Sequence, residues 1–243
     1  MRMLTFANRN TKEILRDPIN LFFGIGFPVI LLLLLSAIQA NIPVKLFEIA
    51  RLTPGITVFG LSFMTLFSAT LISKDRNSAL FSRLYTTPLT ALDFILGYTL
   101  PILPISMAQT VICYIVSMFL GLQITINTLY AVLFNIPISL FYIALGLLFG
   151  SLLNDKQVGG ICGALLTNLT AWLSGIWFDL DLVGGAFKKI AYLFPFVHAV
   201  DMERLIIKGT FDGVLNHLLW VTVYAVVIIF IAVLLFLRQM KKQ

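Results

Sequence analysis

The sequence predicts an all-α integral membrane protein with six transmembrane helices, an N-terminal interfacial helix, a cytoplasmic amphipathic helix and a short outer re-entrant helical segment. The 243 residues are 59% hydrophobic and only 12% charged, whereas soluble domains are about 45–50% apolar and about 25% charged. The mean hydropathy of +0.98 agrees. Long runs without charge complete the evidence. Residues 1–243 are therefore treated as one membrane domain, and soluble, disordered and collagen-like chains are excluded.

The first segment, residues 1–18, is basic and polar, and the apolar run after it is too long for a signal peptide. Its apolar residues can share a helical face opposite its charged ones. Basic residues beside an apolar stripe favour a helix in the membrane interface, and a solvated basic tail is the alternative. The apolar residues are Leu4, Ala7, Ile14 and Leu15, and the charged ones are Arg9, Lys12, Glu13 and Arg16.

Five charge-free runs follow, at 18–44, 52–73, 94–154, 157–178 and 213–237. A transmembrane helix needs about 20 apolar residues to cross a hydrocarbon core of about 30 Å. The third run is long enough for two spans, and its polar stretch at 121–127 is the natural break. The spans are therefore expected near 20–40, 53–73, 94–120, 128–152, 157–177 and 214–237.

An even number of spans places both termini on one side of the membrane. With the N-terminus in the cytoplasm, eleven of the 17 Lys and Arg residues lie inside with five acidic residues, and six of each sign lie outside. An excess of Lys and Arg marks the cytoplasmic side. The net charge of +6 thus predicts a multi-pass cell-membrane protein with both termini cytoplasmic, and no nucleic-acid partner.

Two connections are long enough to fold. In the cytoplasmic loop 74–93, Leu80, Phe81, Leu84 and Tyr85 recur at helical spacing, and Pro88 ends that helix. A helix of this kind either docks a soluble partner or lies in the interface. The outer segment 178–212, interrupted by glycines and a proline, predicts short helices that dip into the outer leaflet. A solvated polar stripe on this segment is expected to carry His198, Asp201 and Glu203.

The motifs of catalysis are missing from the sequence. It has no GxxxxGK[ST] phosphate loop and no HExxH metal motif, and Cys113 and Cys162 have no partner at metal-ligand spacing. Apart from end positions such as His217, no ionisable side chain lies inside the expected spans, which argues against transport coupled to protons or sodium. The chain is predicted to be no enzyme and to bind no metal or cofactor itself.

Polar residues at depth are the remaining candidates within the spans. Buried amides must be hydrogen-bonded, so they face other helices or a cavity. The candidates for a substrate pathway are Gln109, Asn135, Asn168 and Thr170, with bonds between helices as the alternative. The pairs Gly146/Gly150 and Gly159/Gly163 have the GxxxG spacing that permits close helix approach.

Two stretches resemble the membrane subunit of type-2 ATP-binding-cassette (ABC) transporters. The first stretch contains Lys74-Asp75-Arg76, then 80–84, Thr87-Pro88-Leu89 and Leu96-Gly97. The second runs from Leu173 to Phe178 and continues with Phe194-Pro195 and 201–209, although Asp179 stands where that family often has a proline. Together the matching positions extend over most of the chain.

The resemblance implies a permease subunit of an exporter that moves a hydrophobic or amphipathic substrate such as a drug, an antibiotic, a lipid-like molecule or a glycan-lipid. It implies a second permease copy, as homodimer or heterodimer, and a separate ABC ATPase that binds ATP and Mg. The coupling residues implied are Lys74, Asp75, Arg76, Leu80, Phe81, Arg83, Leu84, Thr87 and Pro88. The outer gate implied consists of Ser174, Gly175, Phe178 and Pro195. A membrane-embedded lipid-modifying enzyme and an immunity or assembly factor are the alternatives.

Overall fold

The computed structural model describes residues 2–42, 47–78 and 90–240. Within these ranges the regular structure is helical throughout, without a strand. Five helical stretches are long and apolar enough to cross a membrane: Pro18–Gln39, Ile49–Arg76, Leu92–Phe119, Ile126–Leu152 and Val214–Arg238. They correspond to the spans expected near 20–40, 53–73, 94–120, 128–152 and 214–237. The prediction of an all-helical, multi-pass membrane protein is confirmed.

The first span is built from three consecutive helical pieces, α2 (Pro18–Leu21), the π-helical η1 (Phe22–Gly26) and α3 (Phe27–Gln39). Asp17 starts it, because its carboxylate accepts from the backbone N–H of Asn20 at 3.2 Å and Pro18 occupies the first position. Gly24 lets this helix approach its neighbour, since a Cβ there would lie 2.4 Å from the Phe67 ring. The π-helical turn coincides with this contact.

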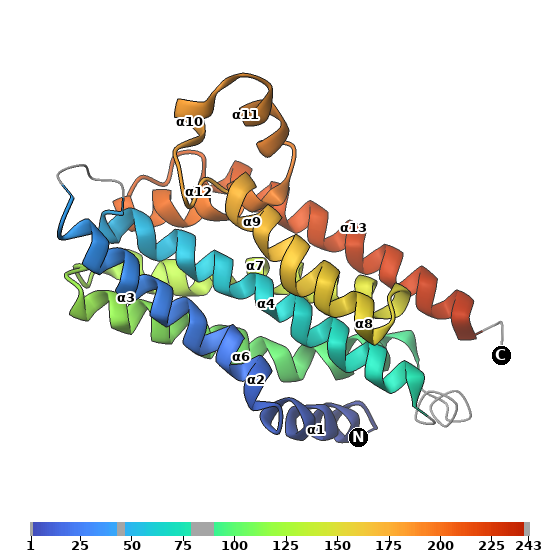
Figure 1. Ribbon diagram of the computed structural model, residues 1–243. Helices are drawn as coiled ribbons and strands as arrows, with labels where there is room; N and C mark the ends of the chain where they lie inside the picture. The colour runs from blue at the N-terminus through green and yellow to red at the C-terminus, as the bar shows by residue number, and fades with distance from the viewer. Residues whose placement is uncertain (1, 43–46, 79–89, 241–243) are drawn as a thin grey trace.

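The central helix is α4 (Ile49–Asn77), which crosses the middle of the bundle in Figure 1. It packs on α3, on α6 (Ala91–Phe119) and on α7 (Ile126–Leu152). Of its most apolar window 89% is buried, compared with 22% for the first and the last span. The outer spans therefore offer apolar surface to lipid or to another chain, whereas α4 forms the core.

The helical stretch in the place of the span expected near 157–177 differs from the other five. It consists of α8 (Asp155–Val158), the π-helical η2 (Gly159–Leu166) and α9 (Thr167–Leu173), and all three pack on α4. Its 19 residues rise about 28 Å, close to a hydrocarbon core of about 30 Å. Charged and polar residues make it less apolar than the five spans. Its passage through the bilayer therefore stays a prediction.

The bundle has two distinct ends (Figure 1). At one end, α1 (Arg2–Leu15) meets the end of α4 and the start of α6, where Phe94 stacks on Phe236 near the end of α13 (Val214–Met240) at 3.7 Å between ring centroids. We name this the α1 end. At the opposite end Arg51, near the start of α4, pairs with Asp179, which follows α9 and precedes α10 (Leu180–Val183). We name this the α10 end.

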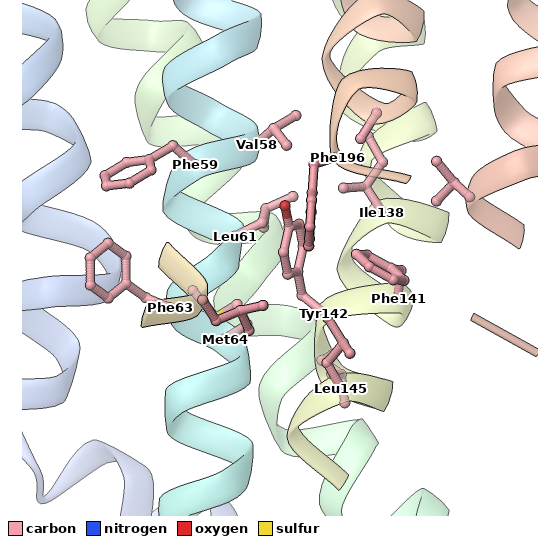
Figure 2. Close-up of a cluster of buried hydrophobic side chains, with 14 of the residues drawn as sticks. Val58, Phe59, Leu61, Phe63, Met64, Ile138, Phe141, Tyr142, Leu145 and Phe196 are labelled. Carbon is pink, nitrogen blue, oxygen red and sulfur yellow. The ribbon is translucent and has the colours of Figure 1, made fainter. Parts of the chain in front are cut away.

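The segment after α9 forms α10, α11 (Gly185–Ala191) and α12 (Pro195–Lys208), and α12 ends at Gly209 with a left-handed φ of 75°. Most of α12 is not at the surface, because it packs on α4, α7 and α13. Figure 2 shows its first turn in the core, where Phe196 stacks on Tyr142 of α7 with ring centroids 6.3 Å apart. The hydroxyl of Tyr224, in α13, donates to the carbonyl of Leu193 at 2.6 Å.

Two details of the sequence-based picture are wrong. The expected solvated stripe on the outer segment does not exist as such, because His198 is 4% exposed and Glu203 is fully buried. The apolar residues of α1 do not form one uniformly covered face either, because Ala7 and Ile14 are buried in the protein whereas Leu4 and Leu15 are exposed. In α1 and α12, the neighbouring helices determine which side chains are buried. The spacing of apolar residues along the sequence alone does not predict this.

Candidate functional site

A single carboxylate joins three helices at the α1 end. Asp75, in the last turns of α4, is 2% exposed, and its Oδ2 accepts from the Arg9 guanidinium of α1 at 2.6 Å. The same Oδ2 accepts from the Tyr98 hydroxyl of α6 at 2.8 Å. Arg9 also pairs with Glu13, one turn further along α1. Burial acts to lower the pKa of Arg9, but the hydrogen bond and charge of Asp75 outweigh it, so the pKa is raised.

Close packing of α1 on α6 supports this carboxylate. The Asn10 amide donates to the carbonyl of Gly97 at 2.9 Å, and the Phe6 ring meets Tyr98 edge-on at 5.0 Å. Only a glycine fits at position 97, because a Cβ there would lie 2.2 Å from the Phe6 ring. Gly97 of the Leu96-Gly97 pair thus has a packing role, because it lets α1 lie close against the start of α6.

The residues on either side of Asp75 fix the end of α4 to two further elements. The Arg76 guanidinium donates to the carbonyls of Ser151 and Leu153, where α7 ends. Nζ of Lys74 lies 3.6 Å from the carboxylate of Asp17, the cap of α2. Lys74, Asp75 and Arg76 therefore connect α4 to the elements around it, and Asp75 is not available on the surface for a partner.

The other expected coupling residues lie outside the described residues: Leu80, Phe81, Arg83, Leu84, Thr87 and Pro88. The structure describes the two ends that flank this stretch. On one side is the Lys74–Arg76 joint, and on the other Thr90 caps α6 by exchanging hydrogen bonds with Asp93. The coupling role of these residues stays a prediction. The structure describes how the chain is held on both sides of them.

The four pathway candidates do not come together in one cavity. Gln109 is buried and donates weakly to the carbonyl of Thr57 at 3.4 Å, and Asn135 is buried and donates to the carbonyl of Ala131 at 3.1 Å. Thr170 is buried, and among the described residues its hydroxyl makes no hydrogen bond of regular geometry. Asn168 is exposed and donates to the carbonyl of Ala164 at 2.8 Å. Of the four, Asn168 alone can reach a molecule outside the chain without a rearrangement.

Two of the four outer-gate candidates line a pocket of about 340 Å³ at the α10 end, namely Ser174 and Gly175. Gly175 has φ of 67°, and its carbonyl accepts from the Arg204 guanidinium at 3.0 Å. Phe178 instead packs against Phe187 at 6.0 Å, and Pro195 is buried as the first residue of α12. The pocket therefore divides the predicted gate residues into two groups.

Four charged residues that were not predicted to come together line this pocket: Arg51, Asp179, Asp201 and Arg204. Arg51 pairs with Asp179 at 2.8 Å, and Arg204 lies 3.7 Å from Asp201. The hydrogen bond from Arg51 lowers the pKa of Asp179, and burial lowers the pKa of Arg204 to about 10. Their positions in the sequence could have indicated this pair, because Arg51 and Asp179 flank two expected spans at the same side of the membrane.

A histidine pair joins α12 to α13 beside the pocket. The Nδ1 atoms of His198 and His217 are 2.8 Å apart, and Nε2 of His198 lies 3.1 Å from the carbonyl of Tyr192. A neutral His198 that donates from Nε2 can accept at Nδ1 from His217, so the pair is satisfied without charge. Burial lowers the pKa of His198, which agrees. No group of three metal-ligating side chains occurs in the described part of the chain.

Comparison with known proteins places these features in a family. A search of curated proteins gives no match. The family model described as ABC-2 type transporter matches residues 2–207, which include α1, the Lys74–Arg76 joint and almost all of α12. Since the match covers most of the chain, and the long apolar helices are those of a membrane domain, the chain belongs to the ABC-2 type transporter family.

Proposed function

We propose that this chain is the permease subunit of an ATP-driven exporter, and that a separate ATPase subunit, which carries ATP and Mg, docks on the segment 76–88. The observation that carries the proposal is the joint at Asp75. A soluble motor protein can move a membrane bundle only through a contact that is firmly connected to it. The joint ties the chain before that segment to α1, α6 and α7.

The mechanism follows from this connection. Closure of the partner ATPases on ATP would displace the docked segment, and the bonds of Asp75 and Arg76 would pass the displacement to α1, α6 and the end of α7. Nucleotide shifts the balance between inward- and outward-facing states only by binding one of them more tightly. We propose that both termini are cytoplasmic in the cell membrane, so that the pocket at the α10 end faces outward and its Ser174 and Gly175 belong to the outer gate with Phe178 and Pro195.

The substrate class proposed is hydrophobic or amphipathic, such as a drug, an antibiotic, a lipid-like molecule or a glycan-lipid. A second copy of the permease, identical or related, would complete the pathway. Exposed Asn168 supports this arrangement, because a side-chain amide on the surface of a membrane bundle can form hydrogen bonds with a neighbouring helix in addition to its bond to Ala164. Gln109, Asn135 and Thr170 would contribute only if the helices around them separate.

The test is a double substitution, Arg83→Glu with Leu84→Asp, in a chain co-expressed with candidate ATPases and reconstituted in liposomes. The expected result is loss of ATPase binding and of ATP-dependent export of amphipathic compounds, with thermal unfolding of the permease unchanged. Lys156→Glu, an exposed charge reversal at the same end of the bundle, is the matched control. Unchanged export by the double variant would contradict docking at this segment.

A further inference from the structure

The buried carboxyl of Glu203 has an environment that suits a neutral acid and not an anion. The side chain is fully buried in α12, which lies outside the five candidate spans. Its Oε2 accepts from the Tyr114 hydroxyl of α6 at 2.7 Å. None of the ion pairs among the described residues involves Glu203. An unpaired buried anion costs several kcal/mol, so such groups neutralise instead.

Within the described part of the chain, Oε1 of Glu203 and Oδ1 of Asn135 in α7 have no hydrogen-bond partner. The Asn135 side chain is near the carboxyl. Burial raises the pKa of Glu203, and hydrogen bonds from Tyr114 and Asn135 act in the opposite direction without outweighing it. Two acceptor oxygens cannot bond to each other without a hydrogen between them. A proton on Oε1 supplies that hydrogen and satisfies both atoms together.

The opposite orientation of the Asn135 amide does not serve an ionised Glu203 equally well. As placed, the amide nitrogen donates to the carbonyl of Ala131 at 3.1 Å. Turning the amide toward the carboxylate would break that bond and bring Oδ1 near another carbonyl oxygen. Buried acceptors left without a donor cost about 1–3 kcal/mol each. The backbone of α7 therefore favours the neutral acid.

The charged and titratable groups on the elements around α12 have partners of their own. On α4, Arg51 pairs with Asp179, and on α13, His217 pairs with His198. On α6, Cys113 accepts from the Gln109 amide. On α12 itself, Arg204 is directed to Asp201 and to the carbonyl of Gly175. None of these groups supplies a charge to balance an ionised Glu203.

We propose that Glu203 is a buried proton-binding site, held as a neutral acid that donates from Oε1 to Asn135 and accepts from Tyr114, and that this proton fastens α12 to α6 and α7. Burial raises the pKa of this carboxyl to about 8, which agrees with the geometry. Loss of the proton to water would leave an unpaired anion in the bundle and would loosen α12. The proposal concerns the folded chain itself, so it stands or fails independently of ATPase coupling and of export.

Infrared spectroscopy of the full chain in lipid nanodiscs tests the protonation state directly. Near pH 7 exposed carboxyls, with pKa values of about 4, are ionised, so the C=O stretch of a neutral carboxylic acid reports buried acids only. We expect this band in the wild type, its loss as the pH is raised to about 10, and its absence near pH 7 in Glu203→Gln. Glu48→Gln, which removes an exposed carboxyl, should keep it. A wild type without the band near pH 7, or a band that persists in Glu203→Gln, would overturn the assignment.

Trp220 reports whether the proton fastens α12, because its ring stacks on His198 of α12 with centroids 4.8 Å apart. With Trp172 and Trp177 replaced by phenylalanine, Trp220 is the only tryptophan. We expect its emission to shift to longer wavelength between about pH 7 and about pH 10, a range above the pKa of His198, which burial lowers from its usual value of about 6.5. In Glu203→Gln the side chain at position 203 can still donate to Asn135 but has no proton that titrates. The Trp220 emission of this variant should therefore not shift. An equal shift in both proteins would show that α12 is not held by this proton.

Discussion

The two glycine pairs with GxxxG spacing, Gly146/Gly150 and Gly159/Gly163, have different surroundings. A Cβ at Gly146 would lie 2.3 Å from Cβ of Ser68 and 2.8 Å from the carbonyl of Thr65, and one at Gly150 would lie 2.9 Å from the Ala69 backbone. At Gly159 such a Cβ would have no atom of another described element within 4 Å. We expect Gly146→Ala and Gly150→Ala each to lower the free energy of unfolding by about 1–3 kcal/mol, because the backbones of α4 and α7 must separate.

Gly159→Ala is the matched control, because the added methyl group meets open space and alanine favours helix over glycine by up to about 1 kcal/mol. Thermal unfolding in detergent should therefore show a lower Tm for the two α7 variants and an unchanged or higher Tm for Gly159→Ala. Equal effects at all three positions would mean that helix propensity, and not the contact between α4 and α7, decides stability.

The ion pair between Arg51 and Asp179 predicts a pH dependence at the α10 end. The folded-state pKa of Asp179 is lowered, chiefly by the hydrogen bond from Arg51. Its stabilisation is therefore present above the unfolded pKa of about 3.9 and disappears as the pH falls through the lower folded-state value. Both side chains are about one third exposed, which limits the contribution to about 1 kcal/mol or less.

The measurement is the Tm of the wild type and of Asp179→Asn as a function of pH. We expect the variant to be slightly less stable at neutral pH, and the two curves to converge in acid because the side chain at position 179 is then neutral in both proteins. A difference that grows as the pH falls would contradict this sign. Added salt should reduce the difference at neutral pH, since the pair is partly solvated.

At the scale of elements, Arg76 acts as a shared cap between α4 and α7. Its guanidinium donates to two carbonyls at the end of α7, which have no partner within their own helix. We expect Arg76→Ala to lower the free energy of unfolding by about 1–3 kcal/mol, because buried acceptors lose a charged donor. Arg76→Lys should recover only part of this, because an ammonium group does not match the two-donor geometry.

Thermal unfolding of both variants, with Lys156→Ala as a control for loss of a positive charge at the same end, checks the prediction. If Arg76→Ala and Lys156→Ala have the same Tm, the two hydrogen bonds contribute nothing. Limited proteolysis near α8 gives a second readout, since a freed end of α7 should be cut faster in Arg76→Ala than in Arg76→Lys.

The sequence predicted the long elements well for a physical reason. An apolar stretch of about 20 residues without charge usually forms a membrane span. The positions of α4, α6, α7 and α13 could therefore be predicted to within a few residues. Packing between distant segments was not accessible in this way. Glu203 is buried because Tyr114, 89 positions earlier, meets it with a hydroxyl, and Asp75 is buried because α1 folds back with Arg9. Both carboxylates resemble ordinary loop charges in the sequence.

On the scale of the whole molecule, the two ends of the bundle determine how often the chain must cross. α7 ends at the α1 end, where Arg76 donates to the carbonyl of Ser151, and α13 begins at the α10 end, where its His217 lines the same pocket as Arg51 and Asp179. The chain between α7 and α13 must therefore run from the α1 end to the α10 end. The helical stretch from α8 to α9 covers this distance. The side of this stretch that packs on α4 carries Val158 and Cys162, whereas its charged residues and Asn168 are exposed.

Cysteine labelling in intact cells tests this return. In a chain with Cys113 and Cys162 replaced by alanine, single cysteines are placed at exposed positions: Asn8 in α1, Asn41 after α3, Lys156 in α8 and Leu182 in α10. A membrane-impermeant maleimide should label positions 41 and 182 in intact cells, and positions 8 and 156 only after lysis. Positions 156 and 182 then bracket one crossing. If both react from the same side of the membrane, the stretch between them does not span, and the chain has five crossings and termini on opposite sides.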